Sequence, residues 1–402
     1  MKHAGFACAV AALGIGCLQA PPSGSPPGDD GGSADAAPPL QFPPEGASVH
    51  LVAALAADVD GNEREDLVLL DDDVDDDFAG LYILRAGEAG WAGLAEVRLG
   101  FRPKSVSFGR NVLPAGPALV VGGSSGRVAV VDYQPEDDAF EARELEFDPA
   151  ATGAISIIHS GRMAAGDETA TLFIDDGSDL FLSDPIDDAV PIALFSLAGG
   201  GVLDAAFWPL QSSDPIDFFA WRRDSQIEWQ IEDEYDSGTD GDLIAARFAH
   251  VDANLCGTYL GVDSDQTLVV GWIDCDRSSS HIAPVKSYVI PQVTAMAAGD
   301  LAGSARHDIA LVGLDGGSVL GQVLIDVALV DDGSPSIAPE QVTEALPLDG
   351  IVPEDILLTP VDVEGDGTAF LYGVAASGAI FCSQVAADAI QPCMSGWTVS
   401  ER

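Results

Sequence analysis

Oxygen-bearing side chains alternate with other residues in one short segment near the start of the chain, residues 57–70 (ADVDGNEREDLVLL). Counted from its first aspartate, positions 1, 3, 5 and 9 are Asp58, Asp60, Asn62 and Asp66, and the backbone carbonyl of Arg64 stands at position 7. Ca²⁺ is a hard cation that takes about six to eight oxygen ligands, and such a loop can supply them. The segment therefore predicts a calcium site, and an acidic surface turn without metal is the alternative.

The elements on either side of this loop must be short and apolar to hold it in place. Residues 67–70 (LVLL) come at once after it and have the length of a buried strand. Gly61 permits the tight turn that gathers the ligands, because glycine adopts backbone conformations that other residues avoid. The predicted unit is thus a metal loop that leads directly into a strand.

Two later segments repeat the spacing with fewer oxygen ligands. In residues 362–370 (DVEGDGTAF), positions 1, 3 and 5 are Asp362, Glu364 and Asp366, whereas position 9 is Phe370. In residues 300–308 (DLAGSARHD), acids remain only at the first and last positions, with a serine at position 5. The number of oxygen ligands predicts a second calcium ion at 362 and disfavours one at 300.

The loop at 58 resembles the D-x-D-G-[DN]-G-x-x-D loop of the FG-GAP/VCBS repeat family, the repeat of integrin alpha-chain β-propellers. Glu63 stands where that family has its second glycine, whereas Gly365 and Gly367 match the glycines of the family. Residues 108–109 (FG) and 115–117 (AGP) echo the letters that name the family. The resemblance implies a β-propeller that carries structural Ca²⁺ at one or two sites and binds protein ligands on one face of the disc.

A loose repeat of three apolar strands and two turns runs from about residue 46 to the end of the chain. Seven copies can be aligned, and their equivalent turns fall near residues 58, 110, 162, 209, 250, 300 and 362. A spacing of about fifty residues is typical of propeller blades with four strands each. The repeat predicts an all-β fold, a seven-bladed β-propeller of four-stranded blades over residues 46–402. Eight blades remain open because the last gap is long, and we expect closure by pairing of segment 48–54 with segment 397–400.

The overall charge of the chain is strongly negative. Lys and Arg total 17 against 65 Asp and Glu, which gives a net charge of −48. This charge argues against nucleic acid and anionic lipid surfaces as direct partners, because both are polyanions. Hydrophobic residues make up 47% of the chain and supply a core, while 44 glycines and 25 prolines fit many short strands joined by tight turns.

The first residues have the composition of an export signal. A basic start precedes an apolar run, residues 4–13, that is too short to span a bilayer, and small residues then lead to Cys17. The segment is similar to the lipobox of bacterial lipoproteins, in which the cysteine carries lipid. Leu13 lies four residues before Cys17, whereas that family has its leucine three before. Residues 1–16 are therefore predicted to be a lipoprotein-type signal peptide, and an ordinary signal cut near Ala20 is the alternative.

Residues 17–45 are rich in proline, glycine, serine and aspartate. They are predicted to be a disordered linker, since they hold too little apolar surface to offset the entropy lost on ordering. The protein is accordingly expected to be exported and lipid-anchored to the bacterial cell envelope, at the outer membrane or cell surface, or otherwise to be secreted.

Cysteine usage agrees with export to an oxidising compartment. Cys8 leaves with the signal, and Cys17 would carry the lipid. An even set of four remains: Cys256, Cys275, Cys382 and Cys393. Three pairings are possible, and we favour the local pairs Cys256–Cys275 and Cys382–Cys393 because each pair flanks one predicted hairpin. Metal binding by these cysteines is the alternative, which the absence of a C-x-x-C spacing disfavours.

Catalytic signatures are scarce. The sequence contains no P-loop, no H-E-x-x-H motif and no dinucleotide fingerprint. Residues 122–126 (GGSSG) fit G-x-S-x-G, but a nucleophile elbow needs a helix after the serine. A second strand is predicted there instead, so the segment is interpreted as a hairpin turn. The histidines are scattered and fit surface or turn positions.

These observations predict a non-enzymatic cell-surface or periplasmic binding or adhesion module built on a calcium-stabilised β-propeller. Its expected partner is an extracellular or envelope protein or a glycan, the membrane is reached only through the lipid anchor, and nucleic acid is not a partner. The alternative is a propeller-scaffold hydrolase or lyase that acts on polysaccharide or phospho-compounds. That alternative requires His, Arg and Asp side chains that converge on the central channel.

Overall fold

The computed structural model describes residues 40–400 apart from short segments within that range. The segments outside the described residues are 1–39, 74–78, 114–115, 146–152, 163–168, 176–178, 184–191, 197–201, 210–216, 224–225, 232–233, 240–241, 250, 252–255, 275–278, 305–306, 316–317, 332–334, 345–355, 387–388 and 401–402. The predicted signal peptide, Cys17 and most of the predicted linker lie among them, as does Cys275. The described strands all belong to the unit formed by Ala37–Arg402.

Within the described residues, seven four-stranded antiparallel sheets succeed one another along the sequence. The first sheet is β2 (Leu51–Ala57), β3 (Asp66–Asp71), β4 (Gly80–Ala86) and β5 (Trp91–Arg98). The second is β6 (Pro103–Leu113), β7 (Gly116–Gly123), β8 (Val128–Gln134) and β9 (Ala139–Leu145). The third is β10 (Ile155–Arg162), β11 (Thr169–Asp175), β12 (Asp179–Ser183) and β13 (Ile192–Ser196).

The remaining four sheets have the same order of strands. The fourth is β14 (Val202–Pro209), β15 (Asp217–Arg223), β16 (Gln226–Ile231) and β17 (Glu234–Thr239). The fifth is β18 (Leu243–Phe248), β19 (Cys256–Asp263), β20 (Leu268–Ile273) and β21 (Ser280–Pro284). The sixth is β22 (Gln292–Gly299), β23 (Asp308–Asp315), β24 (Ser318–Ile325) and β27 (Gln341–Glu344), and the seventh is β28 (Ile356–Val361), β29 (Phe370–Ala375), β30 (Ile380–Ala386) and β31 (Ala389–Pro392).

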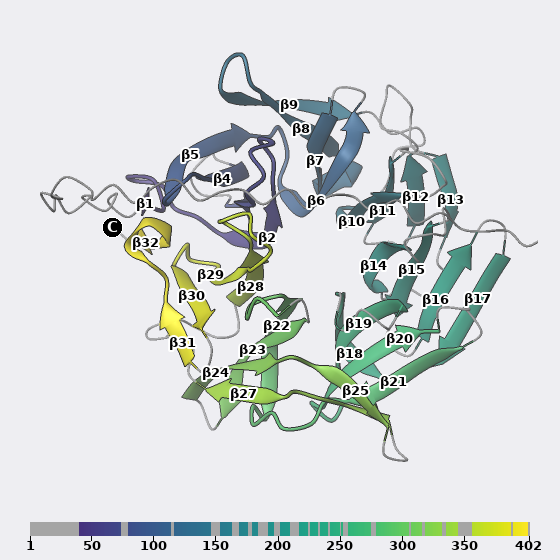
Figure 1. Ribbon diagram of the computed structural model, residues 1–402. Helices are drawn as coiled ribbons and strands as arrows, with labels where there is room; N and C mark the ends of the chain where they lie inside the picture. Colours follow the sequence, from purple (N-terminus) through teal and green to yellow (C-terminus); the bar gives the residue numbers. More distant parts are fainter. Residues whose placement is uncertain are drawn as a thin grey trace, which may run out of the picture. The chain divides into compact units, whose positions relative to one another are not determined.

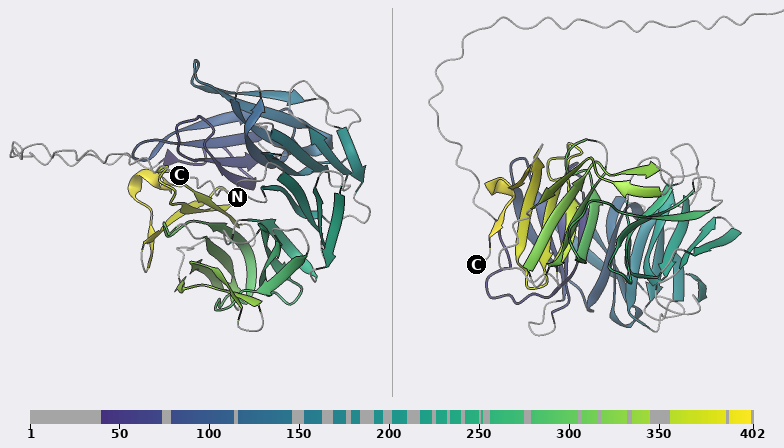
Figure 2. Two further views of the ribbon diagram at one scale, coloured as in Figure 1. Left: turned by 45° about the vertical axis from the view of Figure 1, so that its right-hand side comes forward. Right: turned by 90° about the horizontal axis from the view of Figure 1, so that it is seen from below.

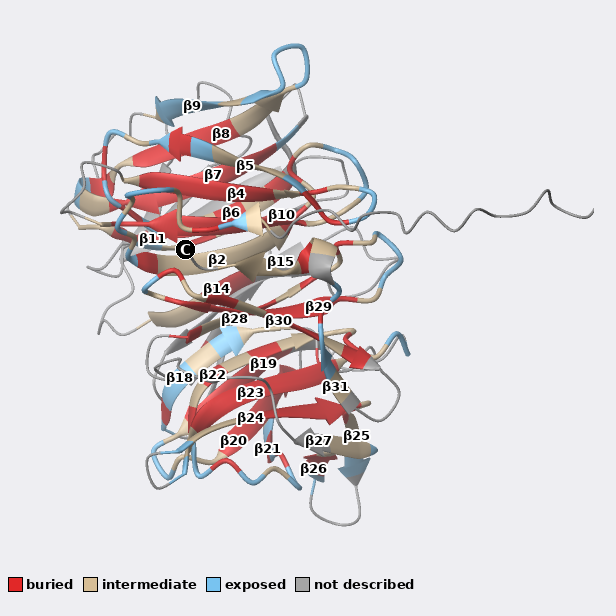
Figure 3. Ribbon diagram, turned by 90° about the vertical axis from the view of Figure 1, so that its left-hand side faces the viewer, coloured by how far each residue is buried: buried red, intermediate tan, exposed pale blue. Residues whose placement is uncertain are grey.

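The middle strands of the sheets are apolar along most of their length. Every residue of β3, β20 and β29 is buried. Continuous apolar runs, rather than alternation, are expected where a sheet is covered on both faces. Fourth strands such as β9 are exposed over most of their length, and Figure 3 shows this contrast between buried and exposed strands. No helix in the described part of the chain has the length and apolar character needed to cross a bilayer.

The sheets are arranged round a central axis (Figures 1 and 2). First strands contact one another in chain order: β2 with β6, β6 with β10, β10 with β14, and β14 with β18. β19 then contacts β22, β22 contacts β28, and β28 contacts β2, so the circuit closes. A closed circuit of radial antiparallel sheets is the arrangement of a β-propeller. The predicted all-β propeller fold is thereby confirmed.

A β-bulge recurs near the start of the first strand in six of the sheets. The register shifts between Leu51 and Ala53 in β2 and between Pro103 and Ser105 in β6, and likewise in β10, β14, β18 and β22. Bulges bend a strand and increase its twist. Their shared position indicates that the six strands are irregular at the same point, which the apolar pattern alone did not predict.

An inserted hairpin explains why the sixth repeat is longer than the others. β25 (Ala328–Asp331) and β26 (Pro335–Ala338) lie between β24 and β27 in the sequence and form a sheet of their own. The hairpin reaches the fifth sheet, where Val285 bridges to Ile337 and the Lys286 N–H donates to the Ile337 carbonyl at 2.8 Å. The hairpin therefore braces two neighbouring sheets.

The predicted closure of the ring was wrong. Segment 48–54 does not pair with segment 397–400; β2 is instead the first strand of its own sheet and pairs with β3. β32 (Val399–Ser400) pairs in parallel with β1 (Leu40–Gln41), which comes from a segment predicted to be linker. Each four-stranded sheet is thus made from one continuous stretch of chain, and the two ends meet in a separate pair.

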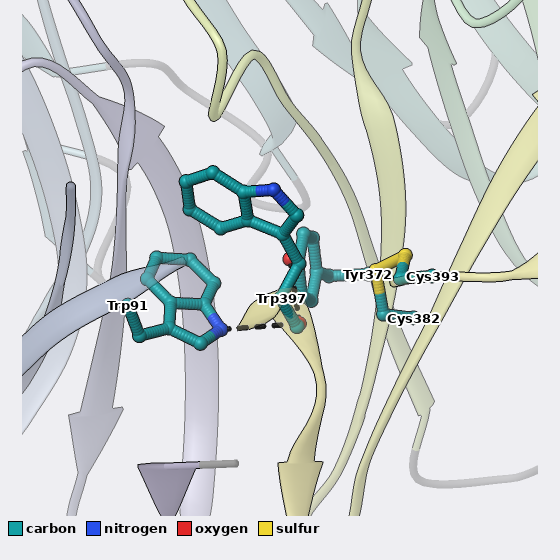
Figure 4. The surroundings of a disulfide bond; sticks show 5 residues. All are labelled: Trp91, Tyr372, Cys382, Cys393 and Trp397. Atoms are coloured by element: carbon teal, nitrogen blue, oxygen red, sulfur yellow. Dashed lines mark hydrogen bonds between the residues drawn. A yellow bond between two sulfur atoms is a disulfide. The ribbon is translucent and has the colours of Figure 1, made fainter. Parts of the chain in front are cut away.

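Aromatic side chains pack where the seventh sheet meets the first, a junction that we call the seam. Trp91 Nε1 and the Tyr372 hydroxyl both donate to the carbonyl of Trp397, at 3.1 and 3.0 Å (Figure 4). This carbonyl lies at the end of η3 (Ser395–Trp397). A disulfide joins Cys382 to Cys393, the local pair expected from the sequence, whereas its predicted counterpart involves Cys275, which lies outside the described residues.

Candidate cation-binding loops and the central channel

The first predicted metal loop is a tight, exposed turn between β2 and β3. Gly61 (φ +77°) and Glu63 (φ +67°) adopt the left-handed conformation at positions 4 and 6. The loop at 362 has this conformation at the same two positions, which are Gly365 (φ +69°) and Gly367 (φ +90°). Glu63 therefore keeps the same turn as Gly367 but accepts a backbone conformation that costs about 1 kcal/mol for a residue with a Cβ.

The aspartate at position 1 holds each turn together. The Asp58 carboxylate accepts the N–H groups of Asn62 at 2.9 Å and Glu63 at 3.0 Å. Asp362 accepts the equivalent N–H groups of Asp366 at 3.2 Å and Gly367 at 2.8 Å. Aspartate favours such turns because its short side chain reaches backbone donors a few residues ahead. The two loops are therefore organised in the same way.

Asp66, at position 9, lies beneath the first loop. It is fully buried, and its two oxygens accept the N–H groups of Val59 at 3.2 Å and Ala86 at 2.8 Å. Burial, together with the nearby charges of Asp60 and Asp58, raises the pKa of Asp66 to about 7. Asp66 thus ties the loop to the end of β4, and both of its oxygens are engaged by backbone N–H groups.

Asp308 holds the equivalent position beneath the loop at 300. It too is fully buried, and it accepts the N–H groups of Leu301 and Asp326, each at 2.8 Å. The recurrence at 66 and 308 indicates a structural part for the last aspartate of the repeat. In the loop at 362 this position is Phe370, which is buried in the apolar core at the seam.

Asp60, at position 3, already forms an ion pair with the side chain of Arg85. Nε and Nη2 of Arg85 both donate to Oδ2 of Asp60, at 3.0 Å each. Arg85 also donates from Nη1 to Asp138 at 2.7 Å, and its guanidinium lies 5.1 Å from the centre of the Tyr133 ring. Sequence reasoning missed Arg85, because it lies 25 positions from Asp60 at the end of β4 and no local motif marks it.

The loops at 58 and 362 meet across the seam. The Glu65 N–H donates to the Asp362 carbonyl at 2.9 Å, and the Asp362 N–H donates to the Glu65 carboxylate at 2.7 Å. Nη1 of Arg64 donates to the carbonyls of Val363 at 3.2 Å and Glu364 at 3.1 Å. Burial raises the pKa of Glu65, although the bond from the Asp362 N–H lowers it. The two predicted metal loops are therefore in direct contact.

The loop at 300 adjoins the loop at 362 on its other side. The Ala369 N–H donates to the Asp300 carbonyl at 2.7 Å. A Cβ at Gly303 would come within 2.9 Å of Oγ1 of Thr368, so the two loops approach closely. Loops of the sixth, seventh and first sheets thus lie side by side. We call them the acidic strip, defined as residues 300–304, 362–369 and 58–65.

The donor chemistry of the first loop fits a calcium ion. Side-chain oxygens of Asp58, Asp60 and Asn62 and the carbonyl of Arg64 belong to one turn, and the set contains no nitrogen or sulfur ligand. In the described residues, no three His, Cys, Asp or Glu side chains converge as a formed metal shell would. The carboxylates instead bond backbone N–H groups and Arg85, and a bound ion would replace some of these bonds.

A cavity of about 840 Å³ runs along the centre of the ring. All seven first strands contribute to its wall, chiefly with small or aliphatic residues. Charged or titratable residues on the wall include Lys104, Asp204, Arg247 and His307. Lys104 forms an ion pair with Asp72, so its charge is used at the edge of the cavity.

Asp204 joins the fourth and fifth sheets within this wall. Its Oδ2 accepts the Phe248 N–H at 2.7 Å, and its Oδ1 accepts the Ala205 N–H at 2.9 Å. Burial raises the pKa of Asp204 to about 6, although the Phe248 N–H and the charge of Arg247 lower it. Both carboxylate oxygens of Asp204 therefore serve structural bonds, one of them between sheets.

Residues 122–126 form the predicted hairpin turn. η1 (Ser124–Gly126) connects β7 to β8, and the Gly123 N–H donates to the Arg127 carbonyl at 2.9 Å. A strand comes after this turn, as expected, so the helix that a nucleophile elbow needs is not there. The interpretation of G-x-S-x-G as a turn is confirmed.

Comparison with known proteins bears on the fold. No protein-family model and no curated protein matches the chain. Among solved structures, the chain is similar to BBS1N in complex with ARL6DN, soaked with mercury, with a TM-score of 0.52 and 13% identity over 85% of this chain and 93% of that chain. BBS1N in complex with ARL6DN, soaked with lead, matches with a TM-score of 0.52 and 15% identity over 84% of this chain and 93% of that chain. At such identity the likeness concerns the fold alone, and by its sheets, its closed circuit and these neighbours the chain is a β-propeller protein.

Proposed function

We propose that this protein is an exported, non-enzymatic binding or adhesion module built on a seven-bladed β-propeller of the FG-GAP/VCBS kind. The observation that carries the proposal is the acidic strip, in which loops from three consecutive sheets lie side by side and are joined by backbone hydrogen bonds. Such a joined surface suits the docking of a partner better than isolated loops would. Seven blades are supported by the seven four-stranded sheets in the described residues.

The proposed partner is an extracellular or envelope protein or a glycan that reaches the acidic strip. Gly61, Asn62, Glu63 and Asp366 are exposed on it. Carboxylates form charge-assisted hydrogen bonds with Lys and Arg side chains of a partner. The net charge of −48 would also speed the approach of a cationic surface. The strip is therefore the face at which we expect binding.

Structural calcium is part of the proposal. In the first loop the ligands would be Asp58, Asp60, Asn62, the Arg64 carbonyl and Asp66. In the loop at 362 they would be Asp362, Glu364 and Asp366. The ion would neutralise the clustered acids and order the turns. Because the two loops touch through Glu65, order in one of them would be passed to the other.

An anchor at Cys17 completes the proposal. The similarity to a lipobox supports it, and the residues between Cys17 and β1 would form the tether. A tether of this length spans at most about 80 Å when fully extended. Mass spectrometry of the mature N-terminus tests the anchor: we expect a lipid-modified Cys17 and no modification in Cys17→Ala. A mature chain that begins after Ala20 would contradict it.

Thermal unfolding in calcium and in chelator tests the metal sites. At a dissociation constant of about 10⁻⁴ M and about 2 mM calcium, each site should add about 2 kcal/mol. For a domain of this size that is a shift of a few degrees. We expect Asp58→Asn to remove one part of the shift and Asp362→Asn another. A shift that stays as large in both variants as in the parent, and that magnesium also produces, would indicate screening of charge instead of bound calcium.

Binding to isolated envelope material tests the strip as a docking surface. We expect the full chain to bind in calcium and the variant Glu63→Lys to bind at least about tenfold more weakly, because it reverses an exposed charge of the strip at a residue outside the proposed ligand set. Asp265→Lys, exposed on the fifth sheet, is the matched control. The hydrolase or lyase alternative would use His307, Arg247 and Asp204 on the channel wall, and it is less favoured because both oxygens of Asp204 accept backbone N–H groups.

A further inference from the structure

Arg85 is placed to act on the first loop from the strand behind it. It lies at the end of β4, directly before Ala86, whose N–H binds Asp66 and whose carbonyl accepts the Asn62 side chain at 2.9 Å. Its Nε and Nη2 both reach the same oxygen of Asp60, at 3.0 Å each. Arg85 therefore holds Asp60 through two directed hydrogen bonds from its guanidinium and not by electrostatic attraction alone.

The ion pair between Arg85 and Asp60 is largely removed from water. The side chain of Asp60 is 5% exposed and that of Arg85 is 23% exposed. Charge-assisted hydrogen bonds in such surroundings are stronger than exposed ion pairs, which contribute little. A metal ion that binds the Asp60 carboxylate must therefore displace the Arg85 guanidinium.

Arg85 has another anionic partner already within reach. Its Nη1 donates to Asp138 at 2.7 Å, and Tyr133 donates to the same Asp138 oxygen at 2.6 Å. The guanidinium also lies over the Tyr133 ring, 5.1 Å from its centre. Asp138 and Tyr133 belong to the second sheet and its β8–β9 turn, so Arg85 can give up Asp60 and stay paired.

The two acidic loops differ in this respect. At position 3 of the first loop, Oδ2 of Asp60 is held by Arg85 and Oδ1 accepts the Asn62 N–H at 3.2 Å. At position 3 of the loop at 362 stands Glu364, and among the described residues no Lys or Arg forms an ion pair with its carboxylate. The loop at 362 is contacted by Arg64 at the carbonyls of Val363 and Glu364, whereas in the first loop a guanidinium holds the position-3 carboxylate itself.

We propose that Arg85 is an intramolecular competitor of calcium for Asp60. The first loop takes the ion only when the guanidinium releases this carboxylate and remains on Asp138, so occupancy of the loop is linked to the contact between the first and second sheets. The inference rests on the proposed calcium site in that loop. It makes Arg85 a determinant of affinity that the metal-loop pattern does not contain.

Calorimetric calcium titration of the full chain tests the competition. We expect Arg85→Gln to bind calcium at the first loop about tenfold more tightly, which corresponds to about 1.4 kcal/mol. Arg85→Lys should fall between the parent and Arg85→Gln, because it keeps the charge and loses the fork. Asp58→Asn in each background identifies the heat that belongs to the first loop.

Arg127 offers a matched control. It pairs with Glu144 and lies over the Phe101 ring at 5.2 Å, so Arg127→Gln removes the same charge and the same kinds of contact away from the loop. We expect its calcium affinity to equal that of the parent. If Arg127→Gln tightened binding as much as Arg85→Gln, the effect would be one of net charge, and the competition would be refuted.

Two further outcomes separate this inference from the proposed calcium site. If Asp58→Asn removes calcium binding while Arg85→Gln and the parent bind equally, the site stands and the competition is wrong. If Asp58→Asn leaves calcium binding unchanged in the parent and in Arg85→Gln, the first loop holds no ion. The calcium site in that loop and the competition are then both wrong. Nuclear magnetic resonance gives an independent readout. The chemical shift of the Arg85 Nε–H group should change when calcium is added to the parent and stay unchanged in Asp58→Asn.

Discussion

Glu65 and Asp362 exchange two hydrogen bonds across the seam, although 297 positions separate them in the sequence. One bond joins backbone to backbone, and the other uses the Glu65 carboxylate as acceptor. Because no strand is shared between the seventh and first sheets, this exchange is a direct backbone link that holds the two loops together. Its loss should therefore be felt in stability as well as in calcium binding.

Removal of the Glu65 acceptor should destabilise the fold. Glu65→Ala leaves the N–H of Asp362 without its partner, which costs about 1–3 kcal/mol. Glu65→Gln keeps a carbonyl oxygen in the same place and should cost less than half as much. Urea unfolding measures both variants. Equal losses in the two would show that the carboxylate charge, and not the hydrogen bond, is what matters at this position.

Asp204 should make stability fall as the pH rises. Burial raises the pKa of Asp204 from 3.8 to about 6 in the folded state. A raised pKa means that the folded state prefers the protonated acid, so the contribution is full below about pH 4 and is lost as the pH passes about 6. The loss is at most about 3 kcal/mol, since one unit of pKa corresponds to about 1.4 kcal/mol.

The comparison with Asp204→Asn isolates this contribution. The variant cannot ionise, so its stability relative to the parent should improve by about 1–3 kcal/mol between about pH 4 and pH 7.5. Chemical denaturation at the two pH values gives the free energy of unfolding of parent and variant. Any loss of stability that the amide causes at both pH values cancels in the comparison. A parent-to-variant difference that does not change with pH would refute the assignment.

The disulfide Cys382–Cys393 should stabilise the end of the chain. Both cysteines are buried, and the bond closes a loop of 11 positions that leads into η3 and β32. Replacement of both by alanine should cost about 2–3 kcal/mol, chiefly through greater freedom of the unfolded chain. Thermal unfolding of the double variant measures the loss, and near-ultraviolet circular dichroism reports on the tryptophans beside it. An unchanged midpoint would contradict the prediction.

The folded unit should depend on residues before 46. Phe42 is fully buried and meets Tyr82 edge to face, with 5.1 Å between ring centres. Phe42→Ala should cost about 3–5 kcal/mol, the usual range for a core phenylalanine. A chain that starts at residue 46 also loses β1 and should be less stable still, whereas a chain that starts at residue 37 should match the parent. Equal stability of all three would place Phe42 outside the core.

Local signals explain what could be predicted from the sequence. Apolar runs such as residues 67–70 and the aspartate–glycine spacing of the loops depend on neighbours in the chain, so they indicate strands, turns and the phase of the repeat. The spacing presents Asp66 only as a ligand, because a sequence does not tell a buried acceptor of backbone N–H groups from an exposed one. One signal was available in the sequence: the loop at 300 keeps Asp308 although it has lost most of its other acids, which indicates a structural role for this position.

Long-range contacts explain what could not be predicted. The partner of β32 is β1, two residues within a proline-rich segment, and no propensity distinguishes them from the linker around them. Arg85 reaches Asp60 only because β4 runs beside β3 and ends at the loop. The bulges at the start of the first strands are likewise not marked by the apolar pattern of those strands.

The pairing of β1 with β32 has a consequence for synthesis of the protein. During translation each sheet can form as soon as its own stretch has emerged, but Leu40 meets Val399 only after all seven sheets have left the ribosome. Until then Trp91 lacks the Trp397 carbonyl that accepts its indole N–H. A nascent chain that stops before residue 397 would thus leave the indole N–H of Trp91, in the first sheet, without this acceptor.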